Sequence, residues 1–360
     1  MLVPPAISRV APTIARVPHR AVLSIAGSQV PEFLHGILSA SVHTPPRPFY
    51  SAFLHAQGRV LYDAFFYTRT GPDGQKSYLI DYDDTPSDAA LPLLQLIKRY
   101  VLRARVKVRD ASDEYDVWAA WGSEEETSPR KWRWAEHSGV AEPVWDEADG
   151  WAWGSADCEL RDRRAPGMGR RLLVRKGDTP AACSSSELAD SEAYTLHRIL
   201  HGVPEGSADF VRSHALPMES NLDFMGAVDF RKGCWVGQEL TVRTYHTGMI
   251  RKRILPVVLH PPGSLPTGPV TPNPNLASFP AHLEIKPVLS DPQTTRTRGS
   301  GKLLSSVNGV GLALMRLEQV EAAEQGKLGF ALDVKVEGAT KRWQVSHWRP
   351  EWWPQPDGAL

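Results

Sequence analysis

Eight consecutive residues, Lys232 to Glu239, most constrain how this chain can fold. Their sequence, KGCWVGQE, combines a thiol, a cation, an amide and a carboxylate with two glycines four positions apart. Glycines at this spacing indicate tight backbone geometry or a close approach by another group. Ordinary core packing does not call for such a mixture, so the stretch is a candidate functional motif.

Cys234 stands within this motif, beside Lys232 and just before a segment that can begin a helix at Glu239. Such surroundings favour the thiolate, the form that binds metals or attacks electrophiles. The alternative is a small buried side chain with no role in chemistry. The other cysteines, Cys158 and Cys183, are distant in sequence, whereas zinc and iron–sulfur sites want four ligands, often in close pairs. A metal at Cys234 therefore needs ligands from a partner.

The motif and its flanks resemble a known family. KGCWVGQE is similar to the K-G-C-aromatic-x-G-Q-E signature of the YgfZ family, which is related to the glycine-cleavage T-protein. The flanks, 216–222 (LPMESNL) and 243–253 (RTYHTGMIRKR), resemble the eukaryotic branch, the mitochondrial iron–sulfur cluster assembly factors of the Iba type. Weaker likeness at 53–63, 202–206 and 311–314 extends the resemblance over most of the chain.

This resemblance implies an α+β fold. We expect a T-protein-like, folate-binding fold of antiparallel sheets with packed helices, followed by a small C-terminal β-barrel. Residues 21–250 then form the T-protein-like region, in two subdomains with a tryptophan-rich segment at about 114–160. Residues 251–360 form the β-domain, with a proline-rich insertion at about 256–300.

The resemblance also implies a role in the maturation of mitochondrial [4Fe–4S] proteins together with A-type (ISCA-type) scaffold proteins. We hypothesise that Cys234 is one ligand of a bridging [2Fe–2S] cluster and that such a scaffold supplies the remaining ligands, because thiolates are the usual cluster ligands. The chain alone is then a monomer, and the hetero-complex forms around the cluster.

The other motif residues are expected to support this ligand. Arg231 and Lys232 are expected to offset the cluster's charge, and Gly233 and Gly237 to admit the partner's backbone. Gln238 and Glu239 are expected to cap or brace the loop, and Trp235 completes the motif. Met249 and the basic run 251–253 are either further docking surface or a solvated face.

A second interpretation is an aminomethyltransferase-type enzyme that uses tetrahydrofolate for one-carbon transfer. The polar residues assigned to its folate-like pocket are Glu219, Asn221 and Arg243, of which Glu219 and Asn221 equally suit loop caps. The family's catalytic carboxylate falls in 58–63, where Tyr62 occupies the first carboxylate position and Asp63 follows. A phenol with a pKa near ~10 cannot act as a base at neutral pH. Asp63 is then either the base or an ordinary strand-end acid, and we favour the assembly factor.

Composition excludes several other classes. The formal net charge is zero, with 41 basic and 41 acidic residues among 360, and a nucleic-acid binder would show a basic face. No apolar run approaches the ~20 residues of a membrane span. Three scattered cysteines fit a reducing compartment better than a disulfide framework.

The N-terminal segment 1–20 carries three arginines and no acidic residue. This composition is typical of a mitochondrial transit peptide, although its prolines weaken an amphipathic helix and a short disordered arm is the alternative. Together with the resemblance, it predicts an N-terminal arm or transit-peptide remnant and a location in the mitochondrial matrix.

Local signals predict the remaining elements. The tryptophan-rich segment is expected to form two or three strands with inward aromatic side chains and an acidic loop at 124–126, in preference to an aromatic docking surface. The other expected elements are a strand at 21–26, a helix capped by Ser28, a hairpin within 49–68, a strand at 77–82, a helix from Thr85 that Pro92 kinks or delays, a helix at 186–201 closed by Gly202, and a hairpin turning at Asn308-Gly309.

Overall fold

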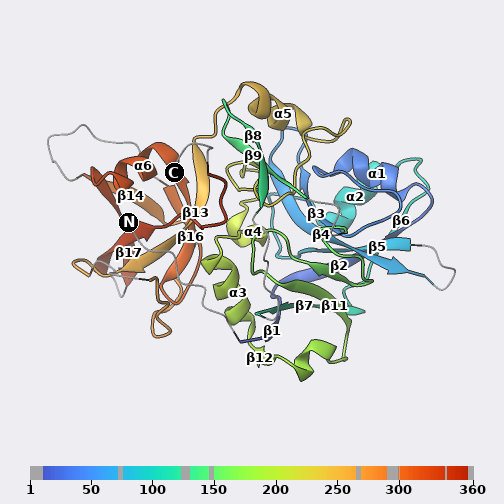
Figure 1. The fold of residues 1–360 in the computed structure, drawn as a ribbon, viewed down its shortest axis with the longest axis horizontal. Coiled ribbons are helices and arrows are strands. Elements are labelled where there is room, and N and C mark those ends of the chain that lie inside the picture. The colour runs from blue at the N-terminus through green and yellow to red at the C-terminus, as the bar shows by residue number, and fades with distance from the viewer. Residues whose placement is uncertain are drawn as a thin grey trace.

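A barrel of C-terminal strands lies beside two sheets formed by the rest of the chain (Figure 1). The computed structural model describes residues 11–71, 76–122, 130–145, 150–264, 269–289, 299, 301–336 and 339–355. None of the helices in these ranges is both long and apolar enough to cross a membrane.

The first sheet has five antiparallel strands in the order β3-β4-β5-β2-β6. Successive side chains of β4 point to opposite faces, and both faces are covered. Phe65 and Tyr67 pack toward the second sheet, whereas Ala64 and Phe66 pack against helices α1 and α2. The bounds are β2 Arg20–Ala26, β3 Phe49–Leu54, β4 Val60–Thr70, β5 Lys76–Asp83, β6 Lys107–Asp110, α1 Val30–Ile37 and α2 Leu93–Val101.

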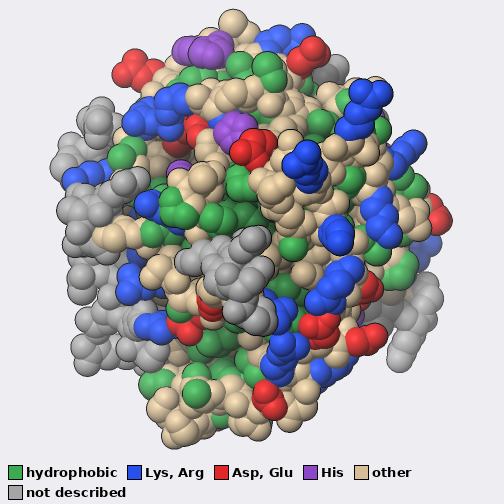
Figure 2. Space-filling view, turned by 90° about the vertical axis from the view of Figure 1, so that its right-hand side faces the viewer, with side chains coloured by type: hydrophobic (Ala, Val, Ile, Leu, Met, Phe, Trp, Pro, Cys, Tyr) green, Lys and Arg blue, Asp and Glu red, His purple; other side chains and the backbone are tan. Residues whose placement is uncertain are grey.

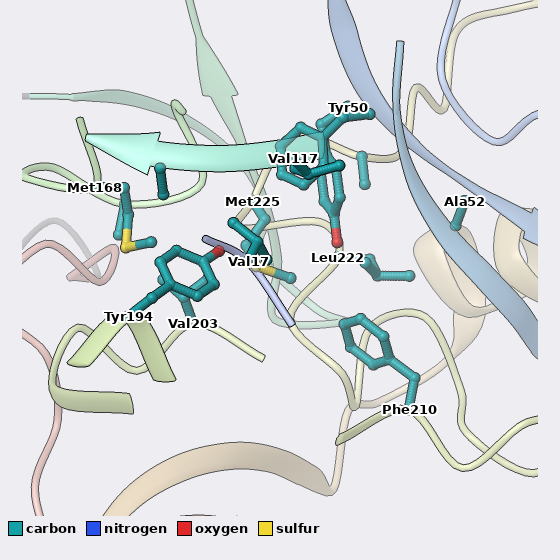
Figure 3. Packing of buried hydrophobic residues seen from close by; sticks show 14 of the residues in the cluster. Val17, Tyr50, Ala52, Val117, Met168, Tyr194, Val203, Phe210, Leu222 and Met225 are labelled. Carbon is teal, nitrogen blue, oxygen red and sulfur yellow. The ribbon is translucent and has the colours of Figure 1, made fainter. Parts of the chain in front are cut away.

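The second sheet has the order β10-β11-β7-β1-β12, in which β1 pairs antiparallel with β7 and parallel with β12. The inner faces of the two sheets enclose the largest apolar cluster. The side chains of Tyr50 on β3 and Tyr194 on α3 both extend into this cluster (Figure 3). The bounds are β1 Thr13–Arg16, β7 Tyr115–Trp121, β10 Glu159–Arg161, β11 Arg170–Arg175, β12 Glu187–Ala189 and α3 Ser191–Leu200.

The C-terminal strands close into a barrel in the order β13-β16-β15-β14-β17-β18. Apolar residues such as Leu255, Ala313 and Leu332 fill its interior and are fully buried. The predicted turn at Asn308-Gly309 is confirmed, since it joins β15 to β16. The bounds are β13 Lys252–His260, β14 Glu284–Leu289, β15 Gly301–Val307, β16 Val310–Arg316, α6 Leu317–Glu324, β17 Leu328–Val336 and β18 Ala339–His347.

The tryptophan-rich segment forms strands, as expected. It contains β7 and the hairpin of β8 (Lys131–Ala135) and β9 (Val140–Val144). Trp121 and Trp153 are buried between the two sheets, and Trp132 packs against the barrel core. The aromatic side chains therefore mainly build interior, and the predicted acidic loop at 124–126 lies outside the described residues.

The predicted N-terminal arm at 1–20 is wrong for its second half. β1 lies inside a sheet, with Ile14 and Ala15 fully buried. Arg20, one of the three arginines attributed to a transit peptide, belongs to β2, and its side chain is 2% exposed and paired with Asp81. An arginine whose carboxylate partner lies far along the chain looks, in sequence alone, like one of a targeting peptide. Residues 1–10 lie outside the described ranges.

Four other boundaries also differ from the expected bounds. Gln29, not Ser28, is the N-cap of α1. α2 starts at Leu93, because Pro92 delays the helix expected from Thr85. α3 starts five residues late because Asp190 accepts a bond from the Ala193 amide. β13 runs to His260 and β14 occupies 284–289, so the proline-rich insertion is shorter than 256–300.

The other helical segments are η2 Ala181–Ser184, α4 Gly206–Asp209 and α5 Gln238–Thr247.

A network of buried charges joins the two sheets. Arg171 of β11 donates to Asp81 of β5 at 2.7 Å and to Glu205 at 2.9 Å. Arg164 lies 2.7 Å from the same Glu205 carboxylate, and Tyr194 donates to it at 2.6 Å. Burial alone raises the pKa of Glu205, but the arginines outweigh that effect and hold its pKa well below the usual value.

Asp63 on β4 lies at the edge of this network without a guanidinium of its own. It is 1% exposed and accepts bonds from the Gly206 amide at 3.1 Å and the Tyr50 hydroxyl at 3.3 Å. Burial raises the pKa of Asp63 to about 6, with Arg20 opposing the rise and Glu205 adding to it. The fold therefore prefers the protonated form of this carboxyl group.

We predict that Asp63→Asn stabilises the protein at pH 7.5. The fold holds Asp63 protonated up to about pH 6, whereas an unfolded chain ionises it near the ordinary value of 3.8. The free energy of unfolding contributed by this group therefore falls as pH rises through that window, by about 3 kcal/mol in total. Urea unfolding should show the variant more stable than wild type at pH 7.5, with the gap reduced to about half at pH 5 and closed only below about pH 4. A gap that does not change with pH would contradict the assignment.

Candidate functional site

The motif 232–239 forms a loop that leads into α5 and is held against the end of α1 (Figure 1). The Lys232 ammonium donates to the carbonyl oxygens of His35, Leu38 and Ala40 at 2.7, 2.7 and 2.9 Å. The last carbonyls of a helix lack partners within the helix and carry partial negative charge. Burial lowers the pKa of Lys232 to about 7, whereas these carbonyls favour the ammonium form. Lys232 thus anchors the loop.

Two further contacts complete the anchor. The Val236 amide donates to the Gly36 carbonyl at 3.0 Å. Trp235 is 6% exposed, its ring belongs to the core between the sheets, and its amide donates to the Gln238 side chain at 3.0 Å. Gln238 therefore braces the loop from the first turn of α5, while Glu239 is exposed in the same turn.

The two glycines of the motif occupy different environments. Gly237 has φ 88° as the N-cap of α5, and a Cβ there would lie 2.6 Å from the His55 carbonyl oxygen and 2.7 Å from Leu54. The fold itself thus requires Gly237, which was expected to admit a partner's backbone. Gly233 has no such constraint, since a Cβ there would meet only His35 Nε2, at 3.9 Å.

Cys234 is the exposed cysteine of the three, whereas Cys158 and Cys183 are half-buried. Arg231, expected to offset cluster charge, is paired instead with Glu142 of β9 at 2.9 and 3.1 Å. No three His, Cys, Asp or Glu side chains of the described ranges gather as a metal site. Cys234 thus stands at the surface of a loop whose flanks are fixed.

The predicted folate-pocket residues do not come together. Glu219 lines a cleft of about 900 Å³ between the 209–220 segment and the barrel. Asn221 is fully buried and donates to the Ile254 carbonyl at 2.7 Å. Arg243 is exposed on α5 and does not line the cleft. Only Glu219 of the three therefore faces this space.

The catalytic-carboxylate stretch is also enclosed. Tyr62 is 5% exposed and its hydroxyl donates to the Leu91 carbonyl at 2.7 Å. Asp63 lies mid-strand in β4, in the charged network, and does not line the cleft. The interpretation of Asp63 as a strand-end acid is therefore wrong about its position, and the carboxylate is not presented to the cleft.

Sequence reasoning missed the segment that receives the motif. His35, Gly36, Leu38 and Ala40 meet the loop through main-chain carbonyls, almost 200 residues away in sequence. Every residue type has a main-chain carbonyl, so no sequence pattern marks these acceptors. His35 carries a recognisable side chain, but nothing local indicates that it faces Gly233.

This chain is similar to a family model and to several known proteins. A family model described as "CAF17, C-terminal beta-barrel domain" matches residues 251–355, which contain the barrel. The chain is 41% identical over 331 residues to "Iron-sulfur cluster assembly factor IBA57 homolog, mitochondrial" of Cryptococcus neoformans var. neoformans serotype D, which covers 86% of this chain and 85% of that protein. The chain belongs to the IBA57 family of iron–sulfur cluster assembly factors. An identically named IBA57 protein of Mycosarcoma maydis is 35% identical over 370 residues, covering 95% of this chain and 85% of its own.

The fold of this IBA57 family member is confirmed by a solved structure. Glycine cleavage system aminomethyltransferase T from Bartonella henselae superposes with a TM-score of 0.56 at 13% identity, over 94% of this chain and 85% of that one. The predicted T-protein-like fold with a C-terminal barrel is thus correct. Both IBA57 relatives are named mitochondrial, which confirms the predicted mitochondrial location, while the matrix stays a prediction.

We predict that alanine destabilises the protein at one of the two motif glycines and not at the other. Gly237→Ala should lower the free energy of unfolding by about 2 kcal/mol or more, because it adds a left-handed backbone penalty and a contact with the His55 carbonyl. Gly233→Ala should change it by no more than about 0.5 kcal/mol, since its Cβ meets open space apart from His35. Urea unfolding measures both. Equal destabilisation would mean that Gly233 is also required by the fold.

Proposed function

We propose that this chain delivers or assembles iron–sulfur clusters in a complex with an A-type (ISCA-type) scaffold, for the maturation of mitochondrial [4Fe–4S] proteins. Cys234 gives one thiolate to a bridging [2Fe–2S] cluster, which is cargo, and the scaffold gives the other ligands. The observation that carries the proposal is the exposed Cys234 on an anchored loop in a chain of the IBA57 family.

The loop suits a shared ligand for a physical reason. A ligand residue is effective when its backbone is held before the metal arrives. Lys232, Trp235 and Val236 fix the backbone on both sides of Cys234 to α1, the core and α5. The thiol itself stays exposed, so a second protein can approach it. Cluster sites usually have four ligands, and one exposed thiolate supplies one.

Exposed side chains on α5 and just after it give the scaffold a contact area. Met249, just after α5, is 70% exposed, and Glu239 and Arg243 are exposed on the helix. The expected basic docking run contributes less, because Arg253 is 3% exposed and pairs with Asp223 at 2.9 Å, and Lys252 lines the cleft. On the face around α1 and α2, Lys and Arg side chains are spread with Asp and Glu between them (Figure 2).

We predict that Cys234→Ala abolishes a coloured hetero-complex. Wild-type chain, an A-type scaffold, ferrous iron, sulfide and reductant are mixed anaerobically, and visible absorption, circular dichroism and size exclusion are recorded. The wild type should form a complex with a cluster spectrum, because Cys234 closes the shared ligand set. Cys183→Ala is the matched control and should behave as wild type, since this half-buried cysteine lies far along the chain.

Two outcomes would overturn this proposal. One is that wild type and scaffold form no coloured complex. The other is that Cys234→Ala retains both cluster and complex. The chain should also elute as a monomer when no scaffold or iron is added.

A second candidate function is tetrahydrofolate binding with one-carbon transfer, and the 900 Å³ cleft favours it. A folate needs an apolar slot, a carboxylate for its pterin edge and cations for its glutamate tail. The cleft offers apolar Leu216, Leu304 and Leu314 together with Glu219. Burial raises the pKa of Glu219, whereas the nearby cations lower it. Those cations are Lys252, Arg59 and Arg316.

We predict that Glu219→Gln weakens tetrahydrofolate binding about tenfold, because a charged acceptor for the pterin edge is lost. Anaerobic calorimetry measures the affinity. Arg243→Ala is the matched control and should leave the affinity unchanged, since Arg243 does not line the cleft. Absence of binding by the wild type would remove this candidate and leave the cluster proposal untouched.

A further inference from the structure

Gly233 is a glycine that the fold does not require. Gly237 needs its left-handed backbone, but φ at Gly233 is not in that region. A methyl group there would touch a single feature, the Nε2 atom of His35, at 3.9 Å. The missing side chain therefore keeps His35 Nε2 uncovered beside Cys234.

The other ring nitrogen of His35 is already used. Its Nδ1 accepts a hydrogen bond from the Val42 amide at 3.4 Å. A nitrogen that accepts from an N–H cannot itself carry a proton, so the neutral ring bears its proton on Nε2. Within the ranges the structure describes, no hydrogen bond is formed by Nε2. His35 thus presents an N–H donor, and not a metal-binding lone pair, toward Gly233.

The surroundings of His35 keep this ring neutral. Burial lowers the pKa of His35, and the Lys232 ammonium, bonded to the His35 carbonyl, lowers it further, whereas Asp229 opposes both. His43 is the remaining charged neighbour and also lowers it. The same lysine that anchors the loop therefore helps to hold the ring as a neutral donor.

We propose that His35 Nε2–H donates a hydrogen bond to a sulfur of the cluster held at Cys234, either a bridging sulfide or the thiolate. This inference rests on the cluster function proposed above. The reduction potential of an iron–sulfur cluster depends on hydrogen bonds to its sulfurs, because such a bond stabilises the more negative, reduced state. His35 is thus a residue that retains and tunes the cargo, while Cys234 is the ligand.

The experiment uses the reconstituted complex of full chain, A-type scaffold and [2Fe–2S] cluster. His35→Phe keeps a planar ring but removes the N–H, His35→Gln keeps a donor, and Gly233→Ala leaves His35 intact but covers Nε2. Gly329→Ala on β17 is the matched glycine control, because a Cβ there meets nothing within 4 Å, whereas a Cβ at Gly233 meets His35 Nε2. For each, we measure the midpoint potential and the rate of cluster loss to a chelator, together with apo-complex affinity and thermal stability.

We expect His35→Phe and Gly233→Ala each to shift the potential to more negative values and to speed cluster loss about tenfold, as the loss of one charge-assisted hydrogen bond implies. His35→Gln should recover part of both, and Gly329→Ala should match wild type. Apo-complex affinity should stay unchanged for His35→Phe and His35→Gln, since docking does not need the bond.

The outcomes separate this inference from the function on which it rests. If wild type assembles the cluster, Cys234→Ala does not, and both His35→Phe and Gly233→Ala behave as wild type, the His35 inference is wrong and the cluster function stands. If wild type assembles no cluster, the function itself fails. A potential altered in His35→Phe but not in Gly233→Ala would also contradict the inference, because both should remove the same bond.

Discussion

The relative placement of the two sheets depends on one buried electrostatic arrangement, the pairing of Arg171 and Arg164 with Glu205 and Asp81. Arg171 comes from the second sheet, Asp81 from the first, and Glu205 from the loop after α3. Burying these ions is tolerable only because each has a partner with good geometry. Displacing one sheet relative to the other would separate Arg171 from Asp81, so the network favours the observed alignment of the sheets. The core supplies the driving force, and the charges select the arrangement.

The candidate site inherits its order from that framework. α1 packs on the outer face of the first sheet, and its C-terminal carbonyls hold Lys232. Trp235 enters the core between the sheets, and Gly237 fits against the hairpin of β3 and β4. The same packing thus holds the residues on either side of Gly233 and Cys234 in place and leaves these two residues exposed. The site is positioned by three separate layers of the fold, not by local sequence.

Much of the fold could be predicted from sequence where the signal is local. The expected strands at 21–26 and 77–82 correspond to β2 and β5, and Asn308-Gly309 identified the hairpin of β15 and β16. The motif KGCWVGQE marked the site loop, because its unusual mixture of residue types is itself the signal. The start of α2 was predicted only as two alternatives, a kink or a delay at Pro92, and the structure shows the delay.

The features of the fold and site that could not be predicted depend on partners that lie far away in the sequence. Arg20 reads as part of a basic leader until Asp81 is seen beside it, and Arg253 reads as docking surface until Asp223 is seen. Asn221 has the polarity of a pocket residue but binds a main-chain carbonyl. In each case the sequence shows the charge or polarity of the side chain but not its burial or its partner, because these are determined by the whole fold.

The position of β1 has a consequence for how the protein matures in the cell. The strand Thr13–Arg16 is hydrogen-bonded on both edges, to β7 and to β12. A peptidase that removed residues from the leading end would have to stop ahead of Thr13, because otherwise the sheet would lose an inner strand. Once β1 is in place, its backbone is shielded from such an enzyme. The fold itself therefore sets how far the leading end can be shortened.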